Sequence, residues 1–146
     1  VADEPIAWVR IRMISSRGSL QYIDYGVADP ELSSRGRMML RPIKLKSFPI
    51  LGRVVDVTWK GEAGGTLYDK SVDLRSEGQR GAELLRRLDE DSPLNELLIR
   101  TGNNLTIRGF PERGVWVMSS FWTGSGISRD EWDSYKALAR HLLAEW

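Results

Sequence analysis

The alternation of apolar and polar positions predicts a β-strand close to the N-terminus. The first run alternates with a period of two: Ala7, Val9, Ile11 and Met13 against Trp8, Arg10 and Arg12. This period is typical of a strand, and it assigns the apolar set to the buried face. A turn at Arg17-Gly18 then favours a returning strand over 20–25, followed by a polar loop over 26–36.

Two further segments alternate in the same way. In the first, residues 38–46, Pro42 lacks the N–H that a ladder needs, so this strand is expected at a sheet edge or with a bulge. In the second, residues 53–60, the apolar residues Val55, Val57 and Trp59 share one face. A glycine-rich loop over 61–65 predicts a hairpin to a partner strand over 66–74.

The pattern then changes to helical spacing. Leu84, Leu85 and Leu88 predict a short helix over 80–90. Ser92-Pro93 predicts the start of a second helix, with Ser92 as N-cap and Pro93 at the first helical position. Its apolar side would be Leu94, Leu97 and Leu98, and Gly102 lies where a C-terminal glycine is expected.

A hairpin and a long helix complete the chain. Residues 104–108 and 115–119 flank a glycine- and proline-containing loop, which predicts the hairpin. Ser128 and Glu131 have the spacing of a capping box and predict a helix start. The apolar stripe that follows runs to the last residue: Trp132, Tyr135, Leu138, Ala139, Leu142, Leu143 and Trp146. Such a stripe is typical of a helix packed on a sheet.

These elements predict one α+β domain over residues 1–146. We expect a mostly antiparallel sheet or a partly closed barrel of about 6–7 strands, with two short helices and a long C-terminal amphipathic helix packed on it. The order is compatible with a pleckstrin-homology-like barrel, an analogy of fold that brings no function with it. The chain begins at Val1 and has no apolar run of membrane-spanning length. We therefore expect a soluble domain, cytoplasmic or excised from a longer or membrane-tethered chain.

The residue types exclude several kinds of chemistry. There is no cysteine, which removes disulfides, thiolate nucleophiles and cysteine-bound zinc, and His141 is the sole histidine. His141 falls in the last turn of the predicted helix, where the dipole favours a cation, so we expect a structural role. Asp89–Asp91 is interpreted as favourable charge ahead of a helix start, and Gly124–Gly126 as a connector without a phosphate-loop pattern. We predict no catalytic residues, no metal site and no cofactor.

The charges are distributed unevenly. Residues 1–60 hold 10 basic and 6 acidic side chains, a net +4, whereas the whole chain has a net charge of +1. Between Glu31 and Asp56 there is no acidic residue. The candidate anion- or partner-binding residues in this interval are Arg35, Arg37, Arg41, Lys44, Lys46 and Arg53. An alternative explanation is that these charges protect an edge strand from aggregation.

The leading functional hypothesis is a non-catalytic binding or interaction module that uses the basic region 35–53. Its partner would be a protein or an anionic membrane surface. Nucleic acid is disfavoured because the pI is about 8.2 and few aromatic residues lie within the basic interval. Two alternatives stay open: a small enzyme that uses carboxylates as acid and base, and an assembly domain that pairs with a second copy through a sheet edge.

Overall fold

The computed structural model describes residues 4–13, 21–32, 38–46, 54–63, 66–68, 78–101, 105–122 and 126–144. These residues form an α+β fold with one antiparallel sheet and three helices. The strands are β1 (Trp8–Met13), β2 (Gln21–Ala28), β3 (Met38–Lys46), β4 (Val54–Ala63), β5 (Thr66–Tyr68), β6 (Thr106–Phe110) and β7 (Val115–Phe121). The helices are α2 (Gly78–Glu90), α3 (Ser92–Arg100) and α4 (Arg129–Leu143).

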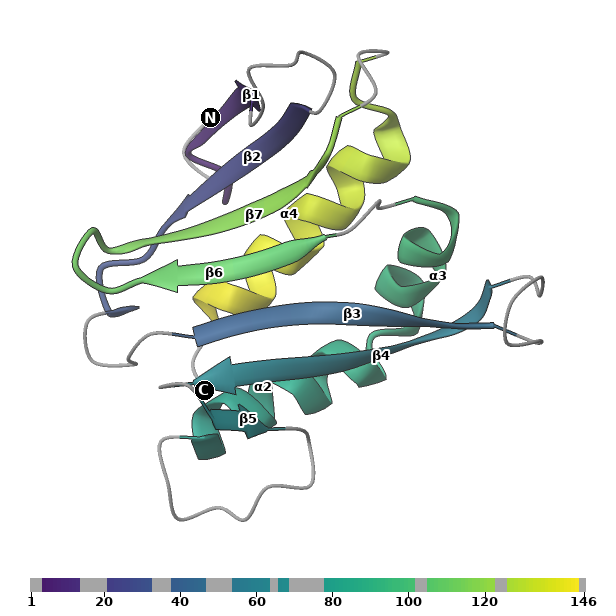
Figure 1. Ribbon diagram of the computed structural model, residues 1–146, viewed down its shortest axis with the longest axis horizontal. Coiled ribbons are helices and arrows are strands. Elements are labelled where there is room, and N and C mark those ends of the chain that lie inside the picture. Colours follow the sequence, from purple (N-terminus) through teal and green to yellow (C-terminus); the bar gives the residue numbers. More distant parts are fainter. Residues whose placement is uncertain are drawn as a thin grey trace.

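The seven strands lie in the order β1-β2-β7-β6-β3-β4-β5. The sheet is open, with β1 and β5 at its two edges, so the barrel arrangement is not the one observed. All three helices cover the same face of the sheet (Figure 1). No described helix lies on the other face, which we call the outer face.

The core lies between the sheet and the helices. Trp59 and Trp116 are fully buried on the helix side, and α4 contributes Tyr135 and Leu138. The ring of Tyr135 stacks on Tyr25 of β2, with 3.9 Å between the centroids, and its hydroxyl bonds to Ser120 Oγ at 2.7 Å. Burial raises the pKa of Tyr135 to about 12. The aromatic side of α4 is therefore part of the core, as its spacing predicts.

The start of α3 corrects one prediction. Its N-cap is Asp91, whose Oδ1 accepts a hydrogen bond from the Leu94 N–H at 3.1 Å, while Ser92 already belongs to the helix. The other oxygen of Asp91 lies 2.7 Å from His141 Nε2. One carboxylate therefore caps α3 and connects it to the last turn of α4, which gives His141 a structural partner.

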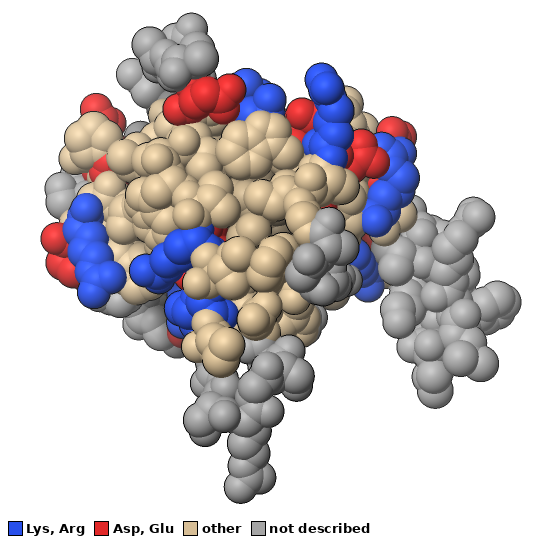
Figure 2. Space-filling model, turned by 90° about the horizontal axis from the view of Figure 1, so that it is seen from above, with Lys and Arg blue, Asp and Glu red and all other residues tan. Residues whose placement is uncertain are grey.

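The apolar row of β1 is the clearest failure of the pattern. Val9, Ile11 and Met13 are 41%, 52% and 60% exposed, although the alternation places them on the buried face. They do point to the helix side of the sheet, since their register partners include Tyr25 and Ile23. Their exposure shows that the helix layer does not cover them at this edge. Figure 2, which looks onto the β1 side from above, shows few charged side chains in its centre.

Pro42 predicted that β3 would lie at a sheet edge or contain a bulge, and the edge position is wrong. The strand lies inside the sheet, between β6 and β4, not at an edge. Its pairing with β6 is limited to Met39 and Leu40, so Pro42 lies beyond the ladder and needs no N–H on that side. A register shift does occur in β3, but between Leu45 and Lys46.

Several boundaries differ as well. β2 extends through Ala28 into the predicted loop, and β4 runs through Gly61 as far as Ala63. The hairpin of β6 and β7 and the cap of α4 by Ser128 are as predicted. Leu142 is buried but Leu143 is 37% exposed, and Trp146 lies outside the described residues.

Candidate functional site

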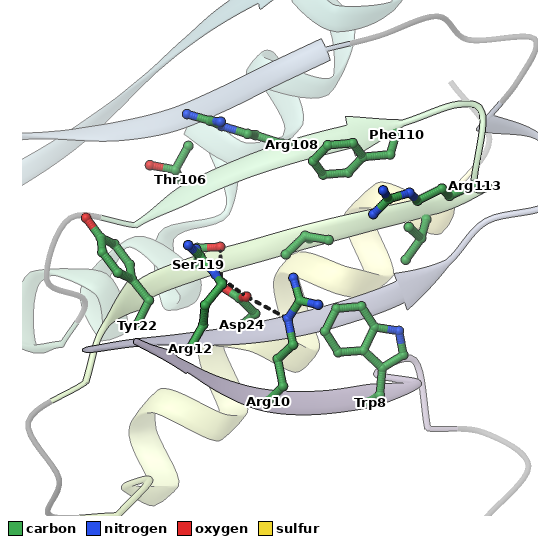
Figure 3. A pocket seen from close by; sticks show the side chains of 12 residues that line it. Trp8, Arg10, Arg12, Tyr22, Asp24, Thr106, Arg108, Phe110, Arg113 and Ser119 are labelled. Atoms are coloured by element: carbon green, nitrogen blue, oxygen red, sulfur yellow. Dashed lines mark hydrogen bonds and ion pairs between the residues drawn. The ribbon is translucent and has the colours of Figure 1, made fainter. Parts of the chain in front are cut away.

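The outer face of the sheet contains a groove of about 720 Å³ over strands β1, β2, β7 and β6. Its charged lining is Arg10, Arg12, Arg108, Arg113 and Asp24, and its aromatic lining is Trp8, Tyr22 and Phe110. We call this set the arginine–aromatic groove. Figure 3 shows Trp8, Arg10, Phe110 and Arg113 toward one end, and Tyr22 and Arg12 toward the other.

Strand register explains how residues so far apart in sequence meet. Residues directly opposite one another in antiparallel strands lie on the same face of the sheet. Arg10 is opposite Asp24, and Asp24 is opposite Ser119, which makes one row across β1, β2 and β7. In the same way, Arg108 on β6 is opposite Val117, whose other neighbour is Gly26. The groove is therefore built from alternate residues of four strands.

Asp24 is the buried centre of this site. Its side chain is fully buried, and it accepts hydrogen bonds from Arg10 Nε at 2.9 Å, from Arg12 Nε at 2.9 Å and from Ser119 Oγ at 2.7 Å. Burial alone raises the pKa of Asp24, but the bonds from Arg12, Ser119 and Arg10 outweigh it and hold the pKa below its usual value. Asp24 is thus ionised at neutral pH and fixes both arginines.

The other two arginines of the groove have no such neutralising partner among the described residues. Arg108 and Arg113 are exposed, and no carboxylate of the described residues lies within ion-pair distance of either. Four arginines and one aspartate leave the lining with a net charge of +3. Arg10 and Arg12 are also 55% and 43% exposed despite their bonds to Asp24. An anion in the groove would therefore meet guanidinium groups from two strands, β1 and β6, and from the β6–β7 turn.

Aromatic rings orient three of these arginines. The guanidinium carbon of Arg10 lies 5.1 Å from the ring centroid of Trp8, and that of Arg12 lies 5.2 Å from Tyr22. Arg113 lies 5.8 Å from Phe110. These are cation–π distances, so the rings help to hold the cations within the groove.

No protein-family model, curated protein or solved structure matches this chain.

The basic residues predicted from sequence are only partly described. Arg35, Arg37 and Arg53 lie outside the described residues, as does the side chain of Lys46. Arg41 is exposed on the outer face, the same face as the groove. Binding by the region 35–53 remains a prediction.

Lys44 points to the opposite face from Arg41. Its ammonium donates to the carbonyl oxygen of Thr101 at 2.6 Å, at the C-terminal end of α3, and burial lowers its pKa. Lys44 and Arg41 therefore do not share one contact surface. The explanation of these charges as protection of an edge strand is also wrong for β3, because β3 is an inner strand.

Among the residues that the structure describes, the remaining candidates give no second site. Within the described ranges, no group of three or more potential ligands is placed to hold a metal ion. Of the 124–126 connector, the structure describes only Gly126, at φ +90°. No helix in the described part of the chain is long and apolar enough to cross a membrane.

Sequence reasoning missed the groove because its residues come from three separated segments. The signal that could have found part of it is the alternation of β1 itself. Trp8, Arg10 and Arg12 share one face of that strand, and we assigned this face to solvent. The sheet order, which the pattern does not contain, places Arg108 and Arg113 near them.

Proposed function

We propose that this chain is a non-catalytic binding module whose arginine–aromatic groove takes an anionic ligand. The observation that supports the proposal is the net charge of +3 among the described residues that line the groove, where the one carboxylate, Asp24, is buried and already bonded. Arginine suits this task because its guanidinium offers several donors in a fixed plane to phosphate or carboxylate. With their Nε atoms engaged by Asp24, Arg10 and Arg12 are pre-oriented for a ligand.

The same groove gives little support to the enzyme alternative. General acid catalysis by a carboxylate needs a raised pKa, so that the proton is held near neutral pH. The pKa of Asp24 is lowered instead. Burial does raise the pKa of Glu131, but this residue is on α4 and does not line the groove.

The test is calorimetric titration of the chain with inorganic tripolyphosphate at low ionic strength. We expect saturable binding by the native chain, and loss of at least tenfold in affinity for the double variant Arg108→Glu/Arg113→Glu. The matched control is Arg129→Glu/Arg140→Glu, which changes the net charge equally on exposed positions of α4. Equal weakening by both double variants would show that net charge, not the groove, determines binding.

A second candidate function is assembly through the β1 edge. The observation in its favour is the exposed row Val9, Ile11 and Met13 on β1, which is an edge strand of the sheet formed by the described residues. Antiparallel pairing of two β1 strands would also bring Arg10 and Arg12 of both copies close together, and like charges opposite one another are destabilising.

Analytical ultracentrifugation separates this candidate from the first. Assembly through β1 should grow stronger with added salt, which screens the arginines, and Ile11→Lys should abolish it. Anion binding in the groove should grow weaker with salt. A chain that stays monomeric at high concentration and at high salt would contradict assembly.

A further inference from the structure

We infer that the anionic ligand of the arginine–aromatic groove is a single-stranded nucleic acid, with a base stacked on Trp8 and phosphates bound by Arg108 and Arg113. This inference rests on the proposed function and specifies its ligand. It starts from a feature that charge alone does not explain, which is the position of the Trp8 ring.

The indole of Trp8 lies over the backbone of its neighbouring strand. Its register partner is Gly26, and a Cβ on Gly26 would overlap the indole atoms Cε2, Cδ2 and Nε1. One side of the ring is therefore packed on β2, yet Trp8 as a whole remains 36% exposed. An aromatic ring held flat on a sheet with an accessible surface is a platform on which a nucleobase can stack.

The cationic side chains line the same groove as this ring. Arg10 lies beside the Trp8 ring, and Arg108 and Arg113 come from the neighbouring hairpin on the same groove. Figure 3 shows the Trp8 ring and these guanidinium groups projecting from the same face of the sheet. Proteins that bind single strands without sequence preference stack the bases on aromatic side chains and contact the phosphate backbone with basic side chains.

Other anionic partners fit this face less well. A double helix hides the faces of its bases, so Trp8 would gain nothing from it. A phospholipid surface would favour basic and apolar side chains on one face, whereas on β1 the arginines and the row of Val9, Ile11 and Met13 alternate to opposite faces. A simple polyanion would use the arginines but not the ring.

The experiment compares probes that share charge but differ in bases. Fluorescence anisotropy would measure binding of four labelled probes: a ten-nucleotide oligouridine, an oligothymidine of the same length, a hairpin duplex and low-mass heparin. Flotation would measure binding to vesicles containing phosphatidylserine. We expect both single strands to bind more tightly than the duplex or the heparin. Tighter binding to the duplex, the heparin or the vesicles would overturn the inference.

The variants separate stacking from charge. Trp8→Ala should weaken binding of oligouridine about tenfold, the order of one lost base stack, and should leave the affinity for tripolyphosphate within about twofold. Trp8→Phe keeps a ring and should retain most of the affinity, which also controls for damage to β1. If Trp8→Ala binds oligouridine like the native chain, the stacking inference is wrong while the anion site stands. If neither oligouridine nor tripolyphosphate binds the native chain at low salt, the proposed function fails as well.

Discussion

The indole of Trp8 occupies the space that a side chain on Gly26, its register partner in β2, would need. Any residue other than glycine at position 26 would force the ring away from the sheet. This relationship links the fold of the β1 edge to the surface that the groove presents.

Gly26→Ala should therefore displace Trp8 and destabilise the chain. Because the overlap is with a side chain, part of the strain can relax, and we expect a loss of about 1–3 kcal/mol in the free energy of unfolding. The measurement is urea unfolding of a double-mutant cycle with Trp8→Ala. The cost of Gly26→Ala should fall sharply once the indole is absent, and an unchanged cost would show that the ring is not what opposes a side chain there.

Asp24 should make stability depend on pH in the acid range. Its folded-state pKa lies below the ordinary value near 3.8, so its contribution is complete above that value and is lost as the pH falls through the folded pKa. Urea unfolding at a series of pH values should show this loss. Asp24→Asn should make the free energy of unfolding depend less on pH in the acid range. At neutral pH it should lower that free energy by about 1–3 kcal/mol, because Arg10 and Arg12 lose their ionised acceptor.

A matched control for Asp24 is Asp133, whose carboxylate is 41% exposed and pairs with Lys136 at 3.6 Å. Asp133→Asn should change stability by less than about 1 kcal/mol, as is usual for exposed pairs. If the stability of the two variants falls in the same way with decreasing pH, the buried carboxylate of Asp24 does not cause the pH dependence.

The cap of α3 gives a prediction that separates two neighbouring residues. Asp91→Ala removes the acceptor for Leu94 N–H and the contact with His141, and should cost about 1–2 kcal/mol. Asp91→Asn keeps a capping oxygen and should cost less. Ser92→Ala should be nearly neutral, because Ser92 is a helical residue and not the cap. Thermal unfolding followed by circular dichroism would measure all three, and a large cost for Ser92→Ala would contradict the assignment of the cap.

The salt dependence of oligouridine binding gives a further check. A single strand that releases about three counterions gives a slope of about −2 in a plot of log K against log salt concentration. The slope should become shallower in Arg108→Glu/Arg113→Glu, if any binding remains. A slope near zero in the native chain would mean that the arginines do not contact phosphates.

Local patterns predicted most of the helices and strands, but not which face of each strand is buried by the helices. The stripe from Trp132 to Leu142 identified α4 because a helix packed on a sheet must bury one face, and this holds for any sheet order. The same logic failed for β1, where the apolar row of Ile11 and its neighbours lies at an edge that the helices do not cover. Alternation shows that two faces differ, but which face is covered depends on tertiary packing.

The candidate site depends even more on information that one segment does not contain. Pro42 indicated an edge or a bulge because a ladder needs its missing N–H. β3 is instead an inner strand whose pairing with β6 ends before Pro42, and its register shift lies between Leu45 and Lys46. With that strand inside the sheet, the residues that gather on the outer face come from β1, β2, β6 and β7 instead. Sequence could predict which arginines are exposed, but not which of them face the same groove.

The most direct test of this account is nuclear magnetic resonance of the ¹⁵N-labelled chain during titration with tripolyphosphate at low salt. The arginine side-chain Nε–H signals and the backbone amides report where the anion binds. We expect the largest shifts at Arg10, Arg12, Arg108 and Arg113. Shifts confined to residues 35–53, or no shifts at saturating tripolyphosphate, would contradict it.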